Sequence, residues 1–427
     1  MDAHHVDAHL ADFAGQADQC TRCGSCQTVC PVHAVTLTES TCPRGKVHLA
    51  REIEANRLTP SKELQEVVFT CLMCKTCLPS CPSGVPTDVL FLRLRRALAV
   101  EVGLPLAKRI AFSALTYRRL FDLGLRLGPA FQSLLFKEAP DGRGGRRSRV
   151  PLPAAGLNMR RIIPSLASRP LRSLLAKRPR INAPKARVAL FPGCMLNYVY
   201  PQAGKAIADI LAKNGIELLL PQGLGCCGVP ALANGDVATA GFLAARNVET
   251  LASCECDAII TGCASCGAAL RNDYALALED NSALQAWNAL RTKVFDIVQY
   301  LAQTGYSRDF KEIKAKVTYH DPCHLARGMG VTAEPRTVIA SLPGVDYVEM
   351  RNAATCCGCG GTFSLTQYEL ARKINDKKID NIEASGAEVL VTGCSACRMH
   401  INDGLSRRPG NIRVMHTAEL VAMAYGA

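Results

Sequence analysis

The sequence has few aromatic residues and no long apolar run. Phe, Trp and Tyr make up 5 % of its 427 residues, and Trp287 is the one tryptophan. No stretch reaches the roughly 18 to 20 apolar residues of a membrane-spanning helix. The first 19 residues are polar and rich in His and Asp, so no secretory signal is predicted. We therefore expect a cytoplasmic protein, either soluble or peripheral on the inner face of the cytoplasmic membrane.

Motifs for nucleotide cofactors and for hydrolytic catalysis are also missing. The sequence has no G-x-G-x-x-G loop between a predicted strand and a predicted helix with an acidic residue after it. We find neither a Ser/His/Asp triad nor a convincing pair of carboxylates. We therefore predict no catalytic side chain and no dinucleotide site of this type on the chain.

Acidic residues are scarce between Phe91 and Arg187, where 22 Lys and Arg stand against four Asp and Glu. Within this segment, residues 107–137 mix leucines and phenylalanines with arginines, which predicts one or two basic amphipathic helices. Such helices either pack on a partner subunit or on the rest of the protein, or lie on an anionic membrane. Nucleic-acid binding is not predicted, because no recognised module accompanies the charge. The glycine-rich stretch 142–149 predicts a flexible loop.

Cysteine, by contrast, is abundant, with 22 residues. A chain of this length buries enough apolar surface to fold without disulfides, and the expected compartment is reducing. The spacing of the cysteines therefore indicates metal binding rather than a disulfide framework.

Eight N-terminal cysteines repeat the spacing of bacterial two-cluster ferredoxins, C-x2-C-x2-C-x3-C-P, twice. A zinc ribbon would need only paired C-x2-C elements. In two-cluster ferredoxins the fourth ligand is exchanged between clusters, which assigns one 4Fe-4S cubane to Cys20, Cys23, Cys26 and Cys81, and the other to Cys71, Cys74, Cys77 and Cys30. Helical periodicity in residues 46–68 and 87–100 favours an all-α ferredoxin domain.

The rest of the chain is an internal duplication. RVALFPGC at 187–194 matches KVTYHDPC at 316–323, GCCG at 225–228 matches TCCG at 355–358, and ITGCASC at 260–266 matches VTGCSAC at 391–397. The offset stays between about 129 and 131 residues, as a duplicated unit requires.

Each repeat alternates β-branched runs with helical stretches such as 202–214 and 369–385, which predicts βαβ units around a small parallel sheet. Most cysteines follow predicted strands, and open α/β sheets build their sites at the carboxyl ends of strands. Two five-thiol sites are therefore expected, made of Cys194, Cys226, Cys227, Cys263 and Cys266, and of Cys323, Cys356, Cys357, Cys394 and Cys397. A cubane or a zinc ion uses four ligands, so five thiolates exceed either need.

The spacing C-x31-C-C-x35-C-x2-C in the first repeat, with C-x32-C-C-x36-C-x2-C in the second, resembles the paired CCG domains of heterodisulfide reductase subunits. With a double ferredoxin module in the same chain, the whole resembles the iron–sulfur subunit family of glycolate oxidase and D-lactate dehydrogenase complexes. The resemblance implies α-helical ferredoxin at 1–103, a basic helical linker at 104–186, and α/β CCG repeats at 187–310 and 311–427.

The resemblance also implies function and cofactors. A separate FAD-containing subunit would oxidise a 2-hydroxy acid, D-lactate or glycolate, and this chain would carry the electrons toward quinone or another carrier. Two cubane clusters are expected, with one or two noncubane 4Fe-4S clusters in the CCG repeats or zinc in one of them. The alternative function is a thiol–disulfide oxidoreductase that acts through a noncubane cluster.

Further residues lie beside these motifs. His320, Asp321, His324 and Arg327 flank Cys323 and either tune a cluster or orient its loop. Cys42, Cys254, Cys256 and Cys359 are interpreted as ordinary thiols outside the ligand sets.

Overall fold

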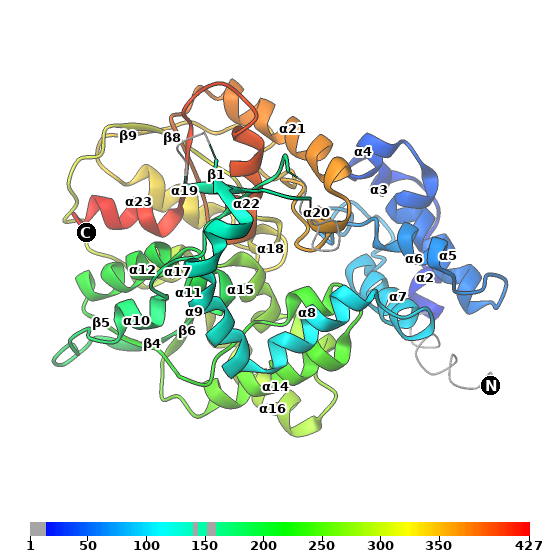
Figure 1. The fold of residues 1–427 in the computed structure, drawn as a ribbon, viewed down its shortest axis with the longest axis horizontal. Helices are drawn as coiled ribbons and strands as arrows, with labels where there is room; N and C mark the ends of the chain where they lie inside the picture. Colours follow the sequence, from blue (N-terminus) through cyan, green and yellow to red (C-terminus); the bar gives the residue numbers. More distant parts are fainter. Residues whose placement is uncertain (1–13, 140–143, 152–158) are drawn as a thin grey trace.

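Two parallel sheets and an N-terminal group of helices make up the computed structural model, which describes residues 14–139, 144–151 and 159–427 (Figure 1). In Figure 1 the N-terminal helices lie on one side, and the two sheets with their helices fill the other. None of the helices in the described ranges is long and apolar enough to cross a membrane.

The N-terminal elements that the structure describes are helices: α2 (Ala14–Asp18), α3 (Ser25–Thr28), α4 (His33–Thr36), the 3-10 turn η1 (Glu39–Thr41), α5 (Pro43–Glu54), α6 (Lys62–Phe69) and α7 (Thr87–Glu101). The helices predicted over 46–68 and 87–100 are confirmed as α5, α6 and α7. The Ser61 hydroxyl accepts from Leu64 N at 3.2 Å and caps α6. Leu90, Leu94 and Leu98 form one buried stripe of α7 against Val47 of α5, which fixes the loops between these helices.

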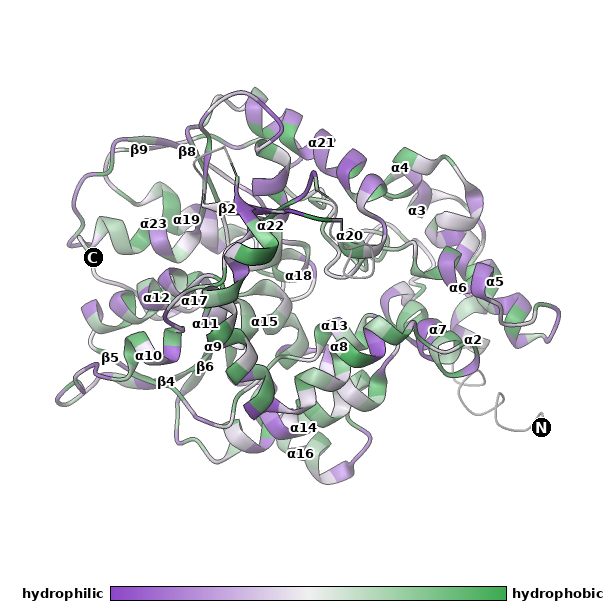
Figure 2. Cartoon of the chain, in the orientation of Figure 1, coloured by the Kyte–Doolittle hydropathy of each residue, from purple (hydrophilic) through white to green (hydrophobic). Residues whose placement is uncertain are grey.

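The basic segment contains helices and also strands: α8 (Leu106–Thr116), α9 (Arg118–Leu135), β1 (Phe136–Glu138), β2 (Gly145–Ser148), β3 (Ile162–Pro164) and α10 (Leu171–Leu175). The two amphipathic helices are confirmed, and the green segments of α9 in Figure 2 mark its hydrophobic residues. The three strands were not predicted within the basic helical linker at 104–186. They form an antiparallel sheet in the order β1-β2-β3.

The prediction of a flexible loop at 142–149 is also wrong for residues 145–148, which form β2. Residues 140–143 lie outside the described ranges. Gly145 pairs with Pro164, and a Cβ at Gly145 would lie 2.3 Å from the Ile162 side chain. The glycine therefore permits a close strand approach instead of indicating a loop.

The two repeats have the same topology. The first sheet has the order β5-β4-β6-β7 and the second β9-β8-β10-β11, with all neighbours parallel. The strands of the first are β4 (Ala186–Phe191), β5 (Ile216–Leu219), β6 (Ala258–Thr261) and β7 (Val294–Asp296), and those of the second are β8 (Ala315–Tyr319), β9 (Val345–Tyr347), β10 (Val389–Thr392) and β11 (Arg413–His416). The predicted βαβ repeats with parallel sheets are confirmed.

Helices connect these strands. In the first repeat they are α11 (Gly193–Tyr198), α12 (Pro201–Lys213), α13 (Val229–Leu232), α14 (Val237–Ala252), α15 (Ala264–Arg271), η3 (Asp273–Leu276), α16 (Asn281–Leu290), η4 (Arg291–Lys293) and α17 (Ile297–Thr304). In the second they are α18 (Cys323–Ala326), α19 (Ala333–Ala340), α20 (Phe363–Thr366), α21 (Tyr368–Ala384), α22 (Ser395–Leu405) and α23 (Thr417–Ala424). The helices predicted over 202–214 and 369–385 are confirmed as α12 and α21.

One hydrophobic core runs through both repeats. A smaller core joins the N-terminal helices to the second repeat, and in it Leu72 packs with Phe363 and Ile374. The packing places the loop that carries Cys71, Cys74 and Cys77 directly against the second CCG motif.

Candidate metal centres

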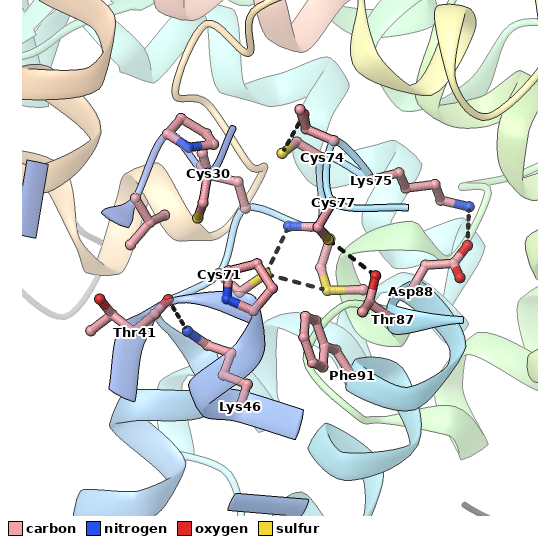
Figure 3. A pocket seen from close by; sticks show the side chains of 16 residues that line it. Cys30, Thr41, Lys46, Cys71, Cys74, Lys75, Cys77, Thr87, Asp88 and Phe91 are labelled. Atoms are coloured by element: carbon pink, nitrogen blue, oxygen red, sulfur yellow. Dashed lines mark hydrogen bonds and ion pairs between the residues drawn. The ribbon is translucent and has the colours of Figure 1, made fainter. Parts of the chain in front are cut away.

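Four cysteines of the N-terminal part surround one cavity. Figure 3 shows the side chains of Cys30, Cys71, Cys74 and Cys77 around it, with Lys46 and Phe91 among its other lining residues. The Thr87 hydroxyl lies 3.0 Å from Cys77 Sγ, and the Thr76 hydroxyl lies 3.2 Å from Cys74 Sγ. The structure therefore brings together the four residues that the sequence assigns to one cluster.

Burial sets the electrostatics of this cavity. It raises the pKa of the Cys30 thiol to about 12, and the nearby thiols of Cys71 and Cys74 add to the shift. It also lowers the pKa of the ammonium of Lys46, which donates to Thr41 O. Lys46 and the fully buried Arg95 bring positive charge close to Cys71, which favours the bound anionic thiolates.

The other N-terminal cysteines lie closer to the surface. Cys23 is exposed, and a hydrogen bond from Ser25 lowers the pKa of its thiol. Burial raises the pKa of Cys26 to about 11, with smaller contributions from neighbouring Cys42 and Cys20. The turn after Cys81 reaches this group, because Ser83 Oγ lies 3.3 Å from Thr21 Oγ1.

In the first repeat, the five predicted cysteines follow three neighbouring strands. Cys194 lies in α11 after β4, and Cys226 and Cys227 lie between β5 and α13. Cys263 directly precedes α15 after β6, and Cys266 lies in the first turn of α15. Their thiols interact as neighbours and shift the pKa of one another, in the order Cys194, Cys226, Cys227, Cys266, Cys263. Sequence analysis missed Asn247, whose amide donates to Cys226 O at 2.8 Å and accepts from Gly225 N at 3.0 Å.

The second repeat has the same arrangement. Its thiols are linked in the order Cys323, Cys356, Cys357, Cys397, Cys394. Asn375 donates to O of Cys357, the second cysteine of the pair, at 2.9 Å, whereas Asn247 donates to O of Cys226, the first cysteine of its pair. The two asparagines do not occupy equivalent positions, because Asn375 of α21 corresponds to Ala244 of α14.

Two contacts connect the cysteines of the N-terminal cavity and the five-thiol sets of the two repeats. Cys263 and Cys394 interact across the interface between the repeats. At the other end, Cys356 interacts with Cys74 of the N-terminal part. Arg327 supports this contact by donating from Nε to Cys74 O at 2.8 Å and from a terminal nitrogen to Ala354 O at 3.0 Å.

The thiol sets suit a polynuclear metal group. Hydrogen bonds with neighbouring thiols and burial raise the pKa of Cys266 and of Cys397 well above the ordinary range. So many thiolates repel one another in a low dielectric, and bound cations remove this penalty by replacing the protons. Five thiols in each repeat exceed the four ligands of a structural zinc, so the residues fit an iron–sulfur cluster.

Glycine is required at both CCG motifs. Gly228 and Gly358 adopt φ values of 81° and 88°. A Cβ on Gly358 would also lie 2.7 Å from Ala371 O. The glycines thus let the paired cysteines turn both side chains toward the site.

Several flanking residues do not join the thiol sets. Cys42 accepts from Gly45 N at 3.3 Å and caps α5, while Cys254 and Cys256 interact with each other. Cys359 is buried near Cys357, with its Sγ 3.9 Å from Ser364 Oγ.

Residues around Cys323, in the segment HDPCHLAR at 320–327, form contacts outside the thiol set. Asp321 forms a two-pronged ion pair with Arg336 at 2.7 and 2.9 Å, and His324 Nδ1 lies 3.0 Å from Ser265 Oγ of the first repeat. Lys378, which sequence analysis missed, is buried beside Cys357, and burial lowers its pKa to about 8.

Comparison with protein families agrees with this architecture. The cysteine-rich CCG domain matches residues 188–271 and 317–402, and the 4Fe-4S dicluster domain matches residues 16–85. A subunit of the fumarate reductase (CoM/CoB) of Methanothermobacter marburgensis is 30 % identical over 95 % of this chain and 72 % of its own length. The chain belongs to this iron–sulfur subunit family, which includes glycolate oxidase and lactate-utilisation proteins.

Other relatives of the family match over different lengths. A Bacillus subtilis protein named "Probable glycolate oxidase iron-sulfur subunit" is 28 % identical over 96 % of this chain and 95 % of its own. Lactate utilization protein A 2 of Bacillus cereus is 30 % identical over 55 % of this chain and 98 % of its own. The family members support an iron–sulfur electron-transfer role in an oxidoreductase.

The fold also resembles a solved structure. A hypothetical protein from Helicobacter pylori aligns over 100 % of this chain and 77 % of its own with a TM-score of 0.51 and 10 % identity. At this identity the similarity shows the fold alone.

Proposed function

We propose that this protein is the electron-transfer subunit of a flavin-dependent 2-hydroxy-acid dehydrogenase complex, with D-lactate or glycolate as the substrate. An FAD-containing partner subunit oxidises the acid, and this chain passes the electrons toward quinone or another carrier. The names of the glycolate oxidase and lactate-utilisation relatives support this choice. Iron–sulfur clusters, when bound, supply one-electron transfer without proton chemistry of their own.

The proposal includes the division of the chain and its ligands. An all-α ferredoxin domain at 1–103 would hold two cubane clusters, on Cys20, Cys23, Cys26 and Cys81, and on Cys30, Cys71, Cys74 and Cys77. After the linker at 104–186, each CCG repeat, at 187–310 and 311–427, would hold one noncubane cluster on its five cysteines. The crowding of buried thiols supports iron over zinc in both repeats.

The observation that carries the proposal is the unbroken series of thiol contacts between the groups. Cys74 meets Cys356, and Cys394 meets Cys263. The order of sites is therefore ferredoxin, second repeat, first repeat, the reverse of the order of the two repeats in the sequence. Such contacts hold neighbouring groups close enough for rapid electron exchange.

Metal analysis of protein purified without oxygen tests the proposal directly. We expect about 16 irons per chain, four per site, with matching acid-labile sulfide and no stoichiometric zinc. Mixing with the reduced flavoprotein should reduce the iron–sulfur clusters, as seen by EPR, with no other electron donor present. About 8 irons with zinc in the repeats, or no reduction by any hydroxy-acid flavoprotein, would contradict it.

A disulfide reductase is the second candidate. It is favoured by the two complete five-thiol sets and by the similarity to a protein named as a subunit of a fumarate reductase (CoM/CoB). In this case the reduced subunit alone would reduce a low-molecular-weight disulfide. The electron-transfer proposal expects the isolated subunit to leave such a disulfide intact.

The helices α8 and α9 carry an exposed apolar stripe that supports contact with a membrane surface. On α9 the residues Leu120, Leu123, Leu127, Phe131 and Leu134 are each at least half exposed and recur every three or four positions. The opposite side of α9 packs on the protein, where Gln132 exchanges hydrogen bonds with Leu166. The stripe is therefore exposed on a helix whose other face is already covered.

The charges beside the stripe complement an anionic membrane. Arg119 and Arg126 are exposed and seven residues apart, so they lie along one border of the stripe. Exposed Ile110 and Leu106 of α8 extend the apolar surface. A helix with these two features lies in the membrane interface with its apolar face inward. α9 also meets the first repeat at Tyr198, whose hydroxyl donates to Asp122.

Vesicle sedimentation tests the membrane surface. The full-length protein should bind vesicles of phosphatidylcholine with phosphatidylglycerol, and Leu127→Glu with Phe131→Glu should abolish binding. Removing Arg119 or Arg126 should weaken binding about fivefold each, because a basic residue near the surface contributes about 1 kcal/mol. Phe242→Glu is the matched control, since Phe242 of α14 is also half exposed but lies outside the stripe. Binding of the double variant equal to that of wild type would assign the stripe to a partner subunit instead.

A further inference from the structure

His320 lies at the carboxyl end of β8, inside the second repeat. Its side chain is completely buried. Nδ1 of the ring lies 3.2 Å from Ala353 O. The imidazole is therefore held in one orientation by a backbone carbonyl.

The surroundings of Ala353 O fix where the ring carries its proton. This oxygen also accepts from Lys378 Nζ at 3.1 Å and from Asp321 N at 3.2 Å. Because a carbonyl only accepts, Nδ1 of the neutral ring must be the donor, and Nε2 is left with a free lone pair. Nε2 is buried, and the described polar group with which the ring interacts on this side is the thiol of Cys357.

The ring faces two cysteines of the second thiol set. The donor atoms of His320, Cys357 and Cys397 all lie within 4.8 Å of one another. All three side chains are buried. A histidine ligand of a metal in proteins usually donates its other ring N–H to a carbonyl or carboxylate, as His320 does to Ala353.

The first repeat lacks this nitrogen. Phe191 stands at the position of His320, at the end of the equivalent strand β4. Likewise, Asn247 of α14 corresponds to the Lys378 of α21 that donates to Ala353 O. The two sites therefore share five cysteines but differ in the sixth residue.

We propose that His320 Nε2 is a direct ligand of the metal group in the second repeat, which makes this site a mixed sulfur–nitrogen centre while the first repeat stays all-sulfur. The proposal rests on the iron–sulfur occupancy proposed above. A neutral imidazole adds no negative charge to the five thiolates, and its nitrogen would distinguish this site from the all-sulfur site of the first repeat.

Pulsed EPR on full-length, anaerobically purified protein tests the assignment. Wild-type protein labelled with 15N-histidine should show a strong nitrogen hyperfine coupling that changes with the isotope, and His320→Phe should lose it. His324→Phe, in the same segment but hydrogen-bonded to Ser265, should keep the coupling. Phe191→His should add a second coupled nitrogen in the first repeat.

Two results would overturn the proposal, and iron analysis separates them. Full iron content with no isotope-sensitive coupling in labelled wild-type protein would mean that His320 is not a ligand, while the proposed function stands. Low iron content with zinc in the second repeat would contradict both this proposal and the proposed function. The labelling experiment needs no variant, so a His320→Phe protein that fails to fold does not prevent the decision.

Discussion

At the scale of single residues, two positions near the thiol sets have an unusual backbone conformation or an unusually buried side chain. Gly358 has a left-handed φ beside Cys357, and Asp296 is buried at the end of β7 with Oδ2 lacking a partner among the described atoms. Such positions tolerate few substitutions, and each allows a specific test.

Replacing Gly358 should damage the second site far more than an ordinary glycine substitution does. In Gly358→Ala, the new Cβ would lie 2.7 Å from Ala371 O in addition to the strained φ. Gly361→Ala is the control, because its φ is also positive, at 58°, but nothing lies within 4 Å of its Cβ. We expect Gly361→Ala to cost about 1 kcal/mol, and Gly358→Ala to cost more and to lose the iron of one site. Equal iron content in the two variants would refute this reasoning.

The buried carboxyl of Asp296 makes stability depend on pH. Burial raises the pKa of Asp296 from 3.8 to about 7. Because the folded state then binds more protons than the unfolded state between about pH 4 and pH 7, the free energy of unfolding falls as pH rises through this window. Asp296→Asn keeps the cap of α17 and removes the charge, since Asn is an equally good capping residue.

We expect Asp296→Asn to be more stable than wild type at pH 8, by about 2–4 kcal/mol, and nearly equal to it at pH 4. Denaturant unfolding of anaerobic protein at the two pH values measures the difference. A stability difference that does not change between the two pH values would show that the carboxyl is not protonated in the folded state.

At the scale of elements, α7 attaches the ferredoxin helices to the repeats. Arg95 of α7 is buried and donates to Cys71 O and Ala233 O, each at 2.7 Å, and to Phe69 O at 3.1 Å. One guanidinium therefore satisfies carbonyls from the end of α6, from a ligand loop and from the first repeat. The adjacent Arg96 forms an ion pair with Glu279 at the surface, at 2.6 Å.

Arg95→Met should therefore destabilise the protein by about 3 kcal/mol, because it leaves buried carbonyls without a donor. Arg96→Met, with a similar change of side chain, should cost less than about 1 kcal/mol because its ion pair is exposed to solvent. Denaturation midpoints of both variants provide the comparison. Similar losses would mean that Arg95 does not hold the ferredoxin helices in place.

At the scale of the whole molecule, the three buried thiol groups form one series in which the second repeat lies in the middle. This order predicts an asymmetry between matched variants. Cys356→Ala with Cys357→Ala should block reduction of the first-repeat site by a donor that acts at the ferredoxin domain. Cys226→Ala with Cys227→Ala should leave reduction of the second-repeat site unchanged.

Rapid-freeze EPR after mixing with the reduced flavoprotein distinguishes these outcomes in the intact complex. We expect the first-repeat signal to stay oxidised on the millisecond scale in the second-repeat variant only. If the first-repeat signal is still reduced at the wild-type rate in that variant, electrons enter the first repeat by another route.

Local patterns in the sequence predicted much of the fold and of the candidate sites. The C-x2-C-x2-C runs place three thiols in a short stretch of backbone, and within each repeat most cysteines follow predicted strands whose carboxyl ends lie at one edge of the same sheet. These are short-range rules, so helices, parallel sheets and groups of cysteines could be predicted. The strand β2 could not, because its pairing depends on Ile162, seventeen residues away.

The sequence by itself determined which cysteines gather, since spacing within a ligand turn and position after a strand depend on local backbone geometry. Only the tertiary structure decided how the groups are ordered. Arg327 meets Cys74 across 253 positions, and Cys394 meets Cys263 across the repeat interface. Likewise, the free nitrogen of His320 depends on Ala353 and Lys378. Such contacts arise from packing between elements distant in the chain, and no periodicity of residues along the sequence specifies them.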